Sequence, residues 1–260
     1  MTSRPKTKKS LGQHFLRDGN MIQKIVHAIS ADRTDRIVEI GPGDGALTGE
    51  LLNAYSDVIA IEIDQRMAEH LRELYPRLEL IEEDILKCDW SRFLNTEKPV
   101  HVIGNLPYYI TSQILFAIFD HRENLTSALL MMQKEVAQRI VAEPHSKEYG
   151  ILSVQSQLMS TPEILFDVPP SVFSPPPKVD SSVIRFIFDK GKLACSDKHL
   201  KTVVRMAFNQ RRKKLSNALK RLNTDLPAKE FDFSLRAEAL SPVMYEKLTA
   251  RLEQLGTFDG

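Results

Sequence analysis

The sequence of 260 residues has little cysteine and no long apolar segment. Its two cysteines, Cys88 and Cys195, have no CxxC spacing and no clustered histidines, so we predict no metal site. Two isolated thiols fit a reducing cytoplasm better than a disulfide-linked, exported protein. No apolar run reaches the roughly 18 residues that a membrane helix needs, and the basic N-terminus lacks an apolar signal core. We therefore expect a cytoplasmic protein that does not enter a membrane.

The sequence also has almost no net charge, because 35 Lys and Arg residues face 34 Asp and Glu residues. The basic residues are nevertheless concentrated in two segments. Residues 1–17 contain five basic residues and no acid, and residues 198–221 contain nine basic residues and no acid. Two such segments in a near-neutral chain indicate a protein that binds a polyanion with its ends. A solvated helix face is the ordinary alternative for either segment alone.

Short apolar runs alternate with amphipathic stretches along the first 190 residues. The predicted strands are residues 36–40, 58–63, 78–81, 100–104, 128–133, 163–168 and 182–188. The predicted helices in this part are residues 47–54, 65–74, 112–121, 134–142 and 150–159. Such alternation is typical of an α/β fold with a largely parallel sheet and helices on both faces. The last two strands are joined by the proline-rich residues 169–177, so we expect the sheet to end in an antiparallel pair.

The pattern changes near residues 190–196, where strand signals stop. Helical patterns follow at residues 198–208, 213–222 and 242–254. We therefore predict two domains: an α/β domain over residues 1–190, with a basic N-terminal tail, and a small all-helical domain over residues 191–260.

A glycine-rich turn, Glu39-Ile40-Gly41-Pro42-Gly43-Asp44-Gly45, lies between the first predicted strand and the next helix. Glycines at such a turn let a ligand approach the backbone closely, although a tight turn alone also uses glycine. A dinucleotide is the competing ligand. Pro42 departs from the dinucleotide fingerprint, and Asp44 places an acid where a pyrophosphate is repelled. A sulfonium nucleoside with an amino acid tail, S-adenosylmethionine, therefore suits the turn better.

Polar residues recur in phase with the strands. Gly41, Glu62, Asp84 and Asn105 are 21, 22 and 21 residues apart; Glu62 lies at the end of a predicted strand, and each of the other three follows one. One βα unit separates each pair, so all four belong to the carboxyl edge of the sheet, where ligands of such folds bind. We assign Glu62 to the ribose hydroxyls and Asp84 to the adenine amino group of the cofactor. Gly41 and Gly43 let its methionine portion pass close to the backbone.

The tetrapeptide Asn105-Leu106-Pro107-Tyr108 predicts the chemistry. An adenine amino nitrogen is a poor nucleophile because its lone pair is delocalised into the ring. The side-chain oxygen of Asn105 and a backbone carbonyl of Leu106 or Pro107 can accept both amino hydrogens and favour tetrahedral geometry at the nitrogen. Tyr108 offers a ring on which the base can stack. Transfer of the methyl group then depends on proximity and electrostatics and needs no metal.

With these motifs the chain resembles the ribosomal RNA small-subunit adenine dimethyltransferases, the bacterial KsgA (RsmA) group and its eukaryotic Dim relatives. The resemblance implies the Rossmann-like class I methyltransferase fold with a seven-stranded, mostly parallel sheet. It rests on residues 11–16, 39–45, 62–64, 84, 105–108, 173–182 and 208–215, which span nearly the whole chain.

The resemblance implies further site residues. His14 and Leu16 belong to a segment that closes over the cofactor, and Phe173 stacks on the target base opposite Tyr108. The ordinary alternative for Phe173 is an anchor beside the prolines. The implied RNA contacts are Lys8, Lys9, Arg205, Arg211, Arg212, Lys213 and Lys214.

The implied substrate is two adjacent adenines in the 3′-terminal hairpin loop of 16S ribosomal RNA, presented by the small ribosomal subunit, with a role in subunit biogenesis. Two alternatives stay open at this point. One is a large-subunit ribosomal RNA adenine methyltransferase of similar design, and the other is a non-catalytic assembly factor. We expect a monomer.

Overall fold

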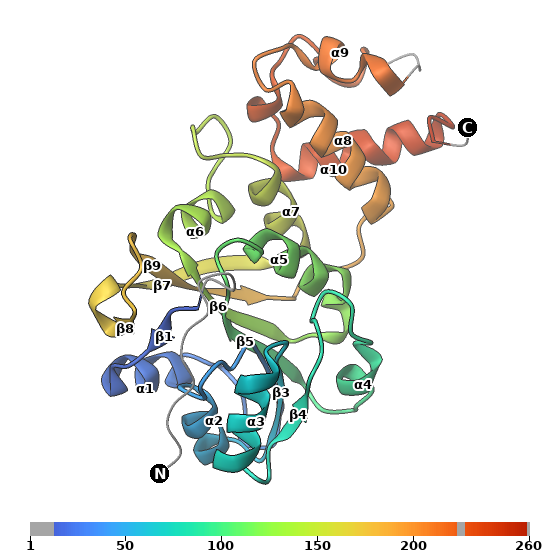
Figure 1. Cartoon of the computed structure of the whole chain (residues 1–260). Helices are drawn as coiled ribbons and strands as arrows, with labels where there is room; N and C mark the ends of the chain where they lie inside the picture. The colour runs from blue at the N-terminus through green and yellow to red at the C-terminus, as the bar shows by residue number, and fades with distance from the viewer. Residues whose placement is uncertain (1–12, 223–226, 259–260) are drawn as a thin grey trace. The chain divides into compact units, whose positions relative to one another are not determined.

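The computed structural model describes residues 13–222 and 227–258 (Figure 1). Lys8 and Lys9, two of the predicted RNA contacts, lie outside these residues. The chain forms two compact units. The first contains the chain up to Ala137 together with Glu163–Phe188, and the second contains Gln138–Pro162 together with Asp189–Gly260.

A seven-stranded sheet forms the centre of the first unit, with the strand order β4-β3-β2-β5-β6-β9-β7 (Figure 1). Its strands are β2 Arg36–Ile40, β3 Asp57–Ile61, β4 Glu79–Ile81, β5 Val100–Asn105, β6 Ser127–Gln133, β7 Thr161–Val168 and β9 Ser181–Ile187. Neighbouring strands from β4 to β6 run parallel, and β9 runs antiparallel to β6. The predicted seven-stranded, mostly parallel sheet is confirmed. The chain order reverses between β2 and β5, and a ligand crevice forms beside such a reversal.

Helices cover both faces of this sheet. The helices of this unit are α1 Gly19–His27, α2 Thr48–Ala54, α3 Gln65–Leu74, α4 Ser91–Leu94 and α5 Thr111–Asp120, and α6 Lys134–Ile140 crosses from this unit into the second. On one face, Ile25 of α1 and Leu51 of α2 share a core cluster with Ile37 and Ile103 of the strands. On the other face, Phe119 of α5 packs edge-on against Phe186 of β9. Side chains alternate along a strand, so burial on both faces explains why these strands are apolar throughout.

A two-stranded sheet joins the N-terminal segment to the proline-rich segment. β1, Phe15–Leu16, pairs antiparallel with β8, Phe173–Ser174. The backbone N–H of Arg17 extends this ladder by donating to the carbonyl of Val172 at 2.8 Å. Strands of two residues have no readable periodicity, and the sequence patterns predicted neither of them.

The second unit is helical, as its pattern predicts. Its elements are α7 Ile151–Met159, α8 Asp197–Asn209, α9 Leu215–Ala218, η4 Lys220–Leu222, η5 Ala237–Ala239 and α10 Pro242–Gln254. The single helix predicted over residues 213–222 is instead two short pieces, α9 and η4. Within residues 13–222 and 227–258, no helix is both long and apolar enough to cross a membrane.

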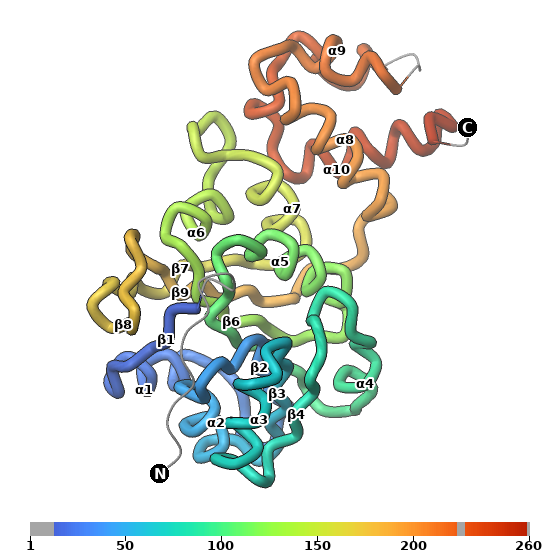
Figure 2. The backbone as a smooth tube through the Cα atoms, viewed as in Figure 1, coloured from blue at the N-terminus to red at the C-terminus, as the bar shows by residue number. Residues whose placement is uncertain are grey.

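Residues 138–162, which the prediction placed in the first domain, group with the C-terminal helices. Figure 2 shows the chain leaving the sheet after β6 and returning to it at β7. In between, α7 packs against α8 and α10. The hydroxyl of buried Tyr149 donates to the carbonyl of Leu240 at 2.8 Å, which ties this excursion to the C-terminal part. Local sequence patterns do not reveal such an excursion, because the packing partners lie about 90 residues away.

A buried polar network lies at the amino ends of the central strands, at the opposite edge from the glycine turn. His101 of β5 bonds to the Ser127 hydroxyl through Nδ1 at 2.7 Å and to the Asp35 carboxylate through Nε2 at 3.2 Å. All three side chains are buried. Burial lowers the pKa of His101 and outweighs the opposing effect of Asp35.

This network predicts a dependence of stability on pH. The unfolded chain binds a proton on His101 near the ordinary pKa of 6.5, whereas the folded chain binds it only at a lower pH. The contribution of His101 to stability therefore falls as the pH drops below about 6.5. We expect His101→Gln to gain stability relative to the parent protein as the pH falls from about 7 to about 5, by at most about 1.4 kcal/mol per pH unit.

Urea unfolding of both proteins at several pH values measures this difference, and the comparison cancels the other titrating groups. A difference that does not vary with pH contradicts the prediction of a buried, neutral imidazole.

Candidate active site

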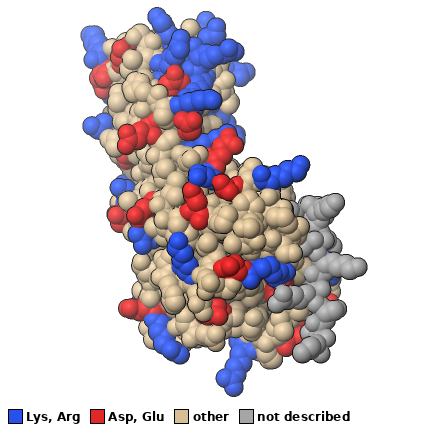
Figure 3. All heavy atoms as spheres, turned by 90° about the vertical axis from the view of Figure 1, so that its left-hand side faces the viewer, with Lys and Arg blue, Asp and Glu red and all other residues tan. Residues whose placement is uncertain are grey.

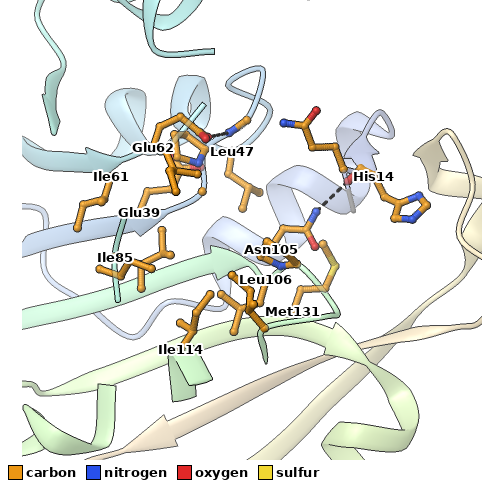
Figure 4. Close-up of a pocket in the computed structure, with 18 of the residues that line it drawn as sticks. His14, Glu39, Leu47, Ile61, Glu62, Ile85, Asn105, Leu106, Ile114 and Met131 are labelled. Carbon is orange, nitrogen blue, oxygen red and sulfur yellow. Dashed lines mark hydrogen bonds between the residues drawn. The ribbon is translucent and has the colours of Figure 1, made fainter. Parts of the chain in front are cut away.

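A cavity of about 360 Å³ lies at the carboxyl ends of the central strands (Figure 4). Nearly all of the predicted cofactor and catalytic residues line it: His14, Leu16, Gly41, Gly43, Glu62, Asp84, Asn105, Leu106, Pro107 and Tyr108. In Figure 4, Glu39 and Glu62 lie at one end of the cavity, and Asn105 and His14 lie at the other. The residues spaced by one βα unit therefore line a single cavity, because each βα unit returns the chain to the same edge of the sheet.

The glycine turn connects β2 to α2 and requires left-handed backbone. Gly41, Gly43 and Gly45 have φ values of 66°, 58° and 84°, which residues with a side chain rarely adopt. A Cβ on Gly43 would lie 2.8 Å from the ring of Phe15, so the N-terminal segment packs directly on this turn. The turn is therefore shaped both to expose backbone to the cavity and to accept the segment above it.

Glu62 holds this turn against the next strand. One carboxylate oxygen accepts the N–H of Gly43 at 3.0 Å, and the other accepts the N–H of Asp64 at 2.8 Å. The side chain is 6% exposed. Burial raises its pKa, and these backbone hydrogen bonds act against that rise. Asp84 borders the cavity after β4, where one carboxylate oxygen accepts the N–H of Leu86 at 3.0 Å.

The charges around the cavity are of one sign. The ionisable acids that line it are Glu39, Asp44, Glu62, Glu83 and Asp84. No Lys or Arg is among the lining residues in the described part of the chain. Such a cavity attracts a cationic ligand and disfavours a pyrophosphate.

Asp44 is paired with a basic residue, whereas the sequence predicted an unpaired carboxylate in the turn. Its Oδ2 forms an ion pair with Arg17 at 2.5 Å, so its charge is largely compensated. The preference against a pyrophosphate therefore depends on the whole set of acids instead of this one residue. The other oxygen, Oδ1, is buried and has no hydrogen-bond partner among the described residues.

Asn105 is oriented by the N-terminal segment. Its side-chain nitrogen donates to the backbone carbonyl of His14 at 3.0 Å (Figure 4). The amide oxygen is thereby left to accept a hydrogen bond from a ligand. The backbone N–H of Leu106 donates to the carbonyl of Met131 at 3.0 Å, which fixes the start of the turn to β6.

The sequence left open whether the backbone carbonyl of Leu106 or that of Pro107 is the second acceptor, and the two have different partners in the structure. The carbonyl of Pro107 already accepts from the N–H of Ile110 at 3.2 Å and the hydroxyl of Thr111 at 3.0 Å. Both bonds begin helix α5. The carbonyl of Leu106 is therefore the better second acceptor for an amino group.

Tyr108 is held through its hydroxyl and stacks through its ring. The hydroxyl lies 2.8 Å from the hydroxyl of Ser181, and the ring stacks with that of His14 at a centroid distance of 5.7 Å. The Nδ1 atom of the His14 ring lies 2.8 Å from the backbone carbonyl oxygen of Pro175. Burial raises the pKa of Tyr108, so its phenol stays protonated at neutral pH and cannot serve as a base.

Phe173 is the predicted residue that the structure does not bring into the cavity. Its side chain is 4% exposed and belongs to the core cluster on the α1 face of the sheet, and it is not among the cavity-lining residues. Its backbone pairs with Leu16. Core packing thus explains the buried position of the ring. This position supports a role as an anchor beside the prolines instead of stacking on a target base.

Three residues near the site were not assigned from the sequence. Glu39 lines the cavity, Arg17 pairs with Asp44, and Ser181 holds Tyr108. Glu39 is part of the glycine motif, so its position was visible but its side chain was not considered. The partners of Arg17 and Ser181 are distant in sequence, and no local signal marks them.

The predicted RNA contacts of the second unit have two different environments. Arg205, Arg212, Lys213 and Lys214 are exposed, and Figure 3 shows Lys and Arg side chains gathered at the end of this unit that carries α9. Arg211 is instead engaged by protein atoms. Its guanidinium donates to the Glu238 carboxylate at 2.8 Å and to the carbonyls of Lys147 and Ser146 at 2.8 and 2.9 Å. Arg211 therefore holds the loop before α7, and its predicted phosphate contact is not supported.

Comparison with known sequences gives a consistent picture. A sequence model described as "Ribosomal RNA adenine dimethylase" matches residues 4–245. The chain is 44% identical to "Ribosomal RNA small subunit methyltransferase A" of Prosthecochloris aestuarii, with 95% of each chain covered. It is 46% identical to the protein of the same name from Porphyromonas gingivalis, with 96% of this chain and 99% of the relative covered.

Two solved structures share the fold over most of their length. A dimethyladenosine transferase from Plasmodium falciparum has a TM-score of 0.81 and 27% identity, covering 94% of this chain and 98% of that one. The 23S rRNA methyltransferase ErmE has a TM-score of 0.63 and 25% identity, covering 92% of this chain and 100% of that one.

The two roles assigned to neighbouring arginines predict different mutational effects. Arg211→Ala removes a charge-assisted bond and two backbone contacts, so we expect it to lower the free energy of unfolding by about 2 kcal/mol. Arg212→Ala, one residue along and exposed, should change stability by less than about 0.5 kcal/mol. It should instead weaken RNA binding and reduce its salt dependence. Urea unfolding and RNA titrations at several salt concentrations separate the two effects. Equal loss of stability in both variants contradicts this assignment.

Proposed function

Because the chain belongs to the ribosomal RNA adenine dimethylase family, we propose that it dimethylates adenines of small-subunit ribosomal RNA with S-adenosylmethionine as methyl donor. The observation that carries this proposal is the position of Asn105. Its side-chain nitrogen is committed to the carbonyl of His14, and its oxygen is presented to a cavity lined with acids. An acceptor beside a site for a cation is what methylation of an amino group requires.

The cavity suits S-adenosylmethionine, which supplies a methyl group on a positively charged sulfur when bound. We assign Glu62 to the ribose hydroxyls and Asp84 to the adenine amino group, and their position at the border of the cavity supports this assignment. The turn around Gly43 offers backbone to the amino acid tail. The buried Oδ1 of Asp44, which has no hydrogen-bond partner within residues 13–222 and 227–258, matches an ammonium donor on that tail.

The chain acts on the target amino group by accepting its hydrogens. The side-chain oxygen of Asn105 and the carbonyl of Leu106 take one N–H each, which favours a tetrahedral nitrogen with its lone pair directed at the methyl group. The nitrogen forms the new bond to carbon, the electron pair of the old bond stays on sulfur, and a proton of the amino group leaves to solvent. No residue is required as a strong base, and Tyr108 stays neutral.

The target base stacks beside Tyr108 after leaving its own stack in the RNA. In the structure, His14 lies against this ring. We infer that the side chain of His14 swings aside as the base arrives, while its backbone carbonyl keeps hold of Asn105. Phe173, buried in the core, takes no part in this step.

The substrate follows from the relatives and the charge pattern. The relatives named "Ribosomal RNA small subunit methyltransferase A" are 43–47% identical to this chain, compared with 25% for the 23S rRNA methyltransferase ErmE. We therefore favour two adjacent adenines of the 16S hairpin loop within the small subunit over a large-subunit target. The exposed Arg205, Arg212, Lys213 and Lys214 are proposed to contact RNA phosphates. We further propose that the protein acts as a monomer in the cytoplasm and takes part in the biogenesis of the small subunit.

Mapping of methylated bases tests the substrate and the chemistry together. We expect labelled S-adenosylmethionine to methylate two adjacent adenines of undermethylated small subunits, and not large subunits. Asn105→Ala should reduce the rate by 100-fold or more, because an acceptor aimed at the reacting group is lost. Tyr108→Phe keeps the ring and should retain most activity, whereas Tyr108→Ala should not. Label confined to large-subunit RNA supports the ErmE-like alternative. Tight subunit binding without any label supports the assembly factor.

The glycine turn provides a test of the cofactor site. Gly43→Ala places a methyl group against Phe15 and forces alanine into left-handed backbone. We expect at least tenfold weaker binding of S-adenosylmethionine by calorimetry. Gly19→Ala is the matched control, because a Cβ at Gly19 meets nothing within 4 Å. Unchanged binding in Gly43→Ala means that the cofactor does not use this turn.

A further inference from the structure

Glu39 is a buried carboxyl group at the wall of the cavity with no assigned role. It is the penultimate residue of β2, it is 2% exposed, and it borders the cavity beneath the glycine turn. Its Oε2 accepts a hydrogen bond from the hydroxyl of Thr48 on α2 at 2.7 Å. A buried carboxyl group with neither a positive partner nor several hydrogen-bond donors favours its protonated form.

The groups that face Glu39 supply no positive charge. Glu62, after β3, is a second buried acid that raises the pKa of Glu39 by repulsion. Asp44 in the turn is occupied by Arg17, and Asp84 borders the same cavity as an acid. Across the described lining, Lys and Arg are absent. Burial, with the repulsion from Glu62, raises the pKa of Glu39 to about 8 despite the Thr48 hydrogen bond.

We propose that Glu39 keeps its proton in the ligand-free cavity and releases it when S-adenosylmethionine binds, so that the cavity recognises the positive charge of the methyl donor. This inference rests on the proposed function. S-adenosylmethionine carries one net positive charge at neutral pH, from its sulfonium and ammonium groups and its carboxylate. S-adenosylhomocysteine, the product, has lost the sulfonium charge and is neutral overall. The ionised Glu39 therefore favours donor over product.

The coupling has a definite sign. If binding expels a proton, the affinity for S-adenosylmethionine rises as the pH rises toward the ligand-free pKa of about 8. Between about pH 6 and pH 7 the dissociation constant should fall by up to about tenfold for the donor and by less for the product. The window lies below the ordinary α-amino pKa of roughly 7.7–8.0, so the ammonium group of the ligand stays protonated throughout.

Calorimetric titration in buffers of different ionisation enthalpy counts the protons directly. At pH 6.5 we expect close to one proton released per S-adenosylmethionine bound and clearly fewer per S-adenosylhomocysteine. Glu39→Gln preserves the shape and neutrality of the protonated side chain. It should still bind both ligands, release no proton from this site, and lose the pH dependence of the donor-to-product affinity ratio.

Thr48→Val provides a variant with an effect in the opposite direction. It removes the hydrogen bond that favours the ionised form of Glu39. The pKa of Glu39 should rise further, so proton release on binding should persist to a higher pH than in the parent protein. A loss of packing alone weakens binding without extending the release to higher pH.

Infrared difference spectra of the parent protein need no variant. They should show a protonated carboxyl band in the ligand-free state that disappears when S-adenosylmethionine is added at pH 6.5. Proton release of equal size in Glu39→Gln, or binding to the parent protein without release, would overturn this inference and leave the proposed function intact. Absence of S-adenosylmethionine binding to the parent protein would overturn both.

Discussion

The site depends on the two hydrogen bonds that the buried carboxylate of Glu62 accepts. They fasten the glycine turn, through the N–H of Gly43, to the end of β3, through the N–H of Asp64. A second link between the same elements is the bond from the N–H of Gly41 to the carbonyl of Ile61. They restrict the left-handed turn, whose glycines have many other conformations available. The turn in turn supports Phe15, and with it the segment that orients Asn105.

Contacts between distant parts of the chain hold the N-terminal segment over the cavity. β1 pairs with β8, and the carbonyl of His14 fixes the amide of Asn105. Arg17, next to β1, neutralises Asp44 in the turn below. The N-terminal segment therefore has two functions at once. It covers the cavity, and it sets the orientation of the group that is proposed to accept the amino hydrogens.

The acidic side chains around the cavity favour a cationic ligand. Acids border it without a basic residue among the described lining, and two of them, Glu39 and Glu62, are buried side chains with raised pKa values. Glu62 is satisfied by backbone N–H groups, whereas Glu39 accepts from a single hydroxyl in the described part of the chain. This difference in partners is why the proposed cofactor contact falls to Glu62 and the proposed proton release to Glu39. The second unit has the opposite character, with exposed basic residues around α9.

Periodicity and spacing determined the sheet, most helix bounds and the set of residues at its carboxyl edge. These features are local, or they repeat with the βα unit, so residues such as Glu62, Asp84 and Asn105 could be placed from the sequence alone. Tertiary structure decided which partners those residues have. The bond between Asn105 and His14 joins residues 91 apart, and Arg211 binds a loop 64 to 65 residues away. Phe173 entered the core, and residues 138–162 joined the C-terminal helices. Such outcomes depend on which apolar and polar groups meet when the chain is compact, and no local pattern in the sequence records that.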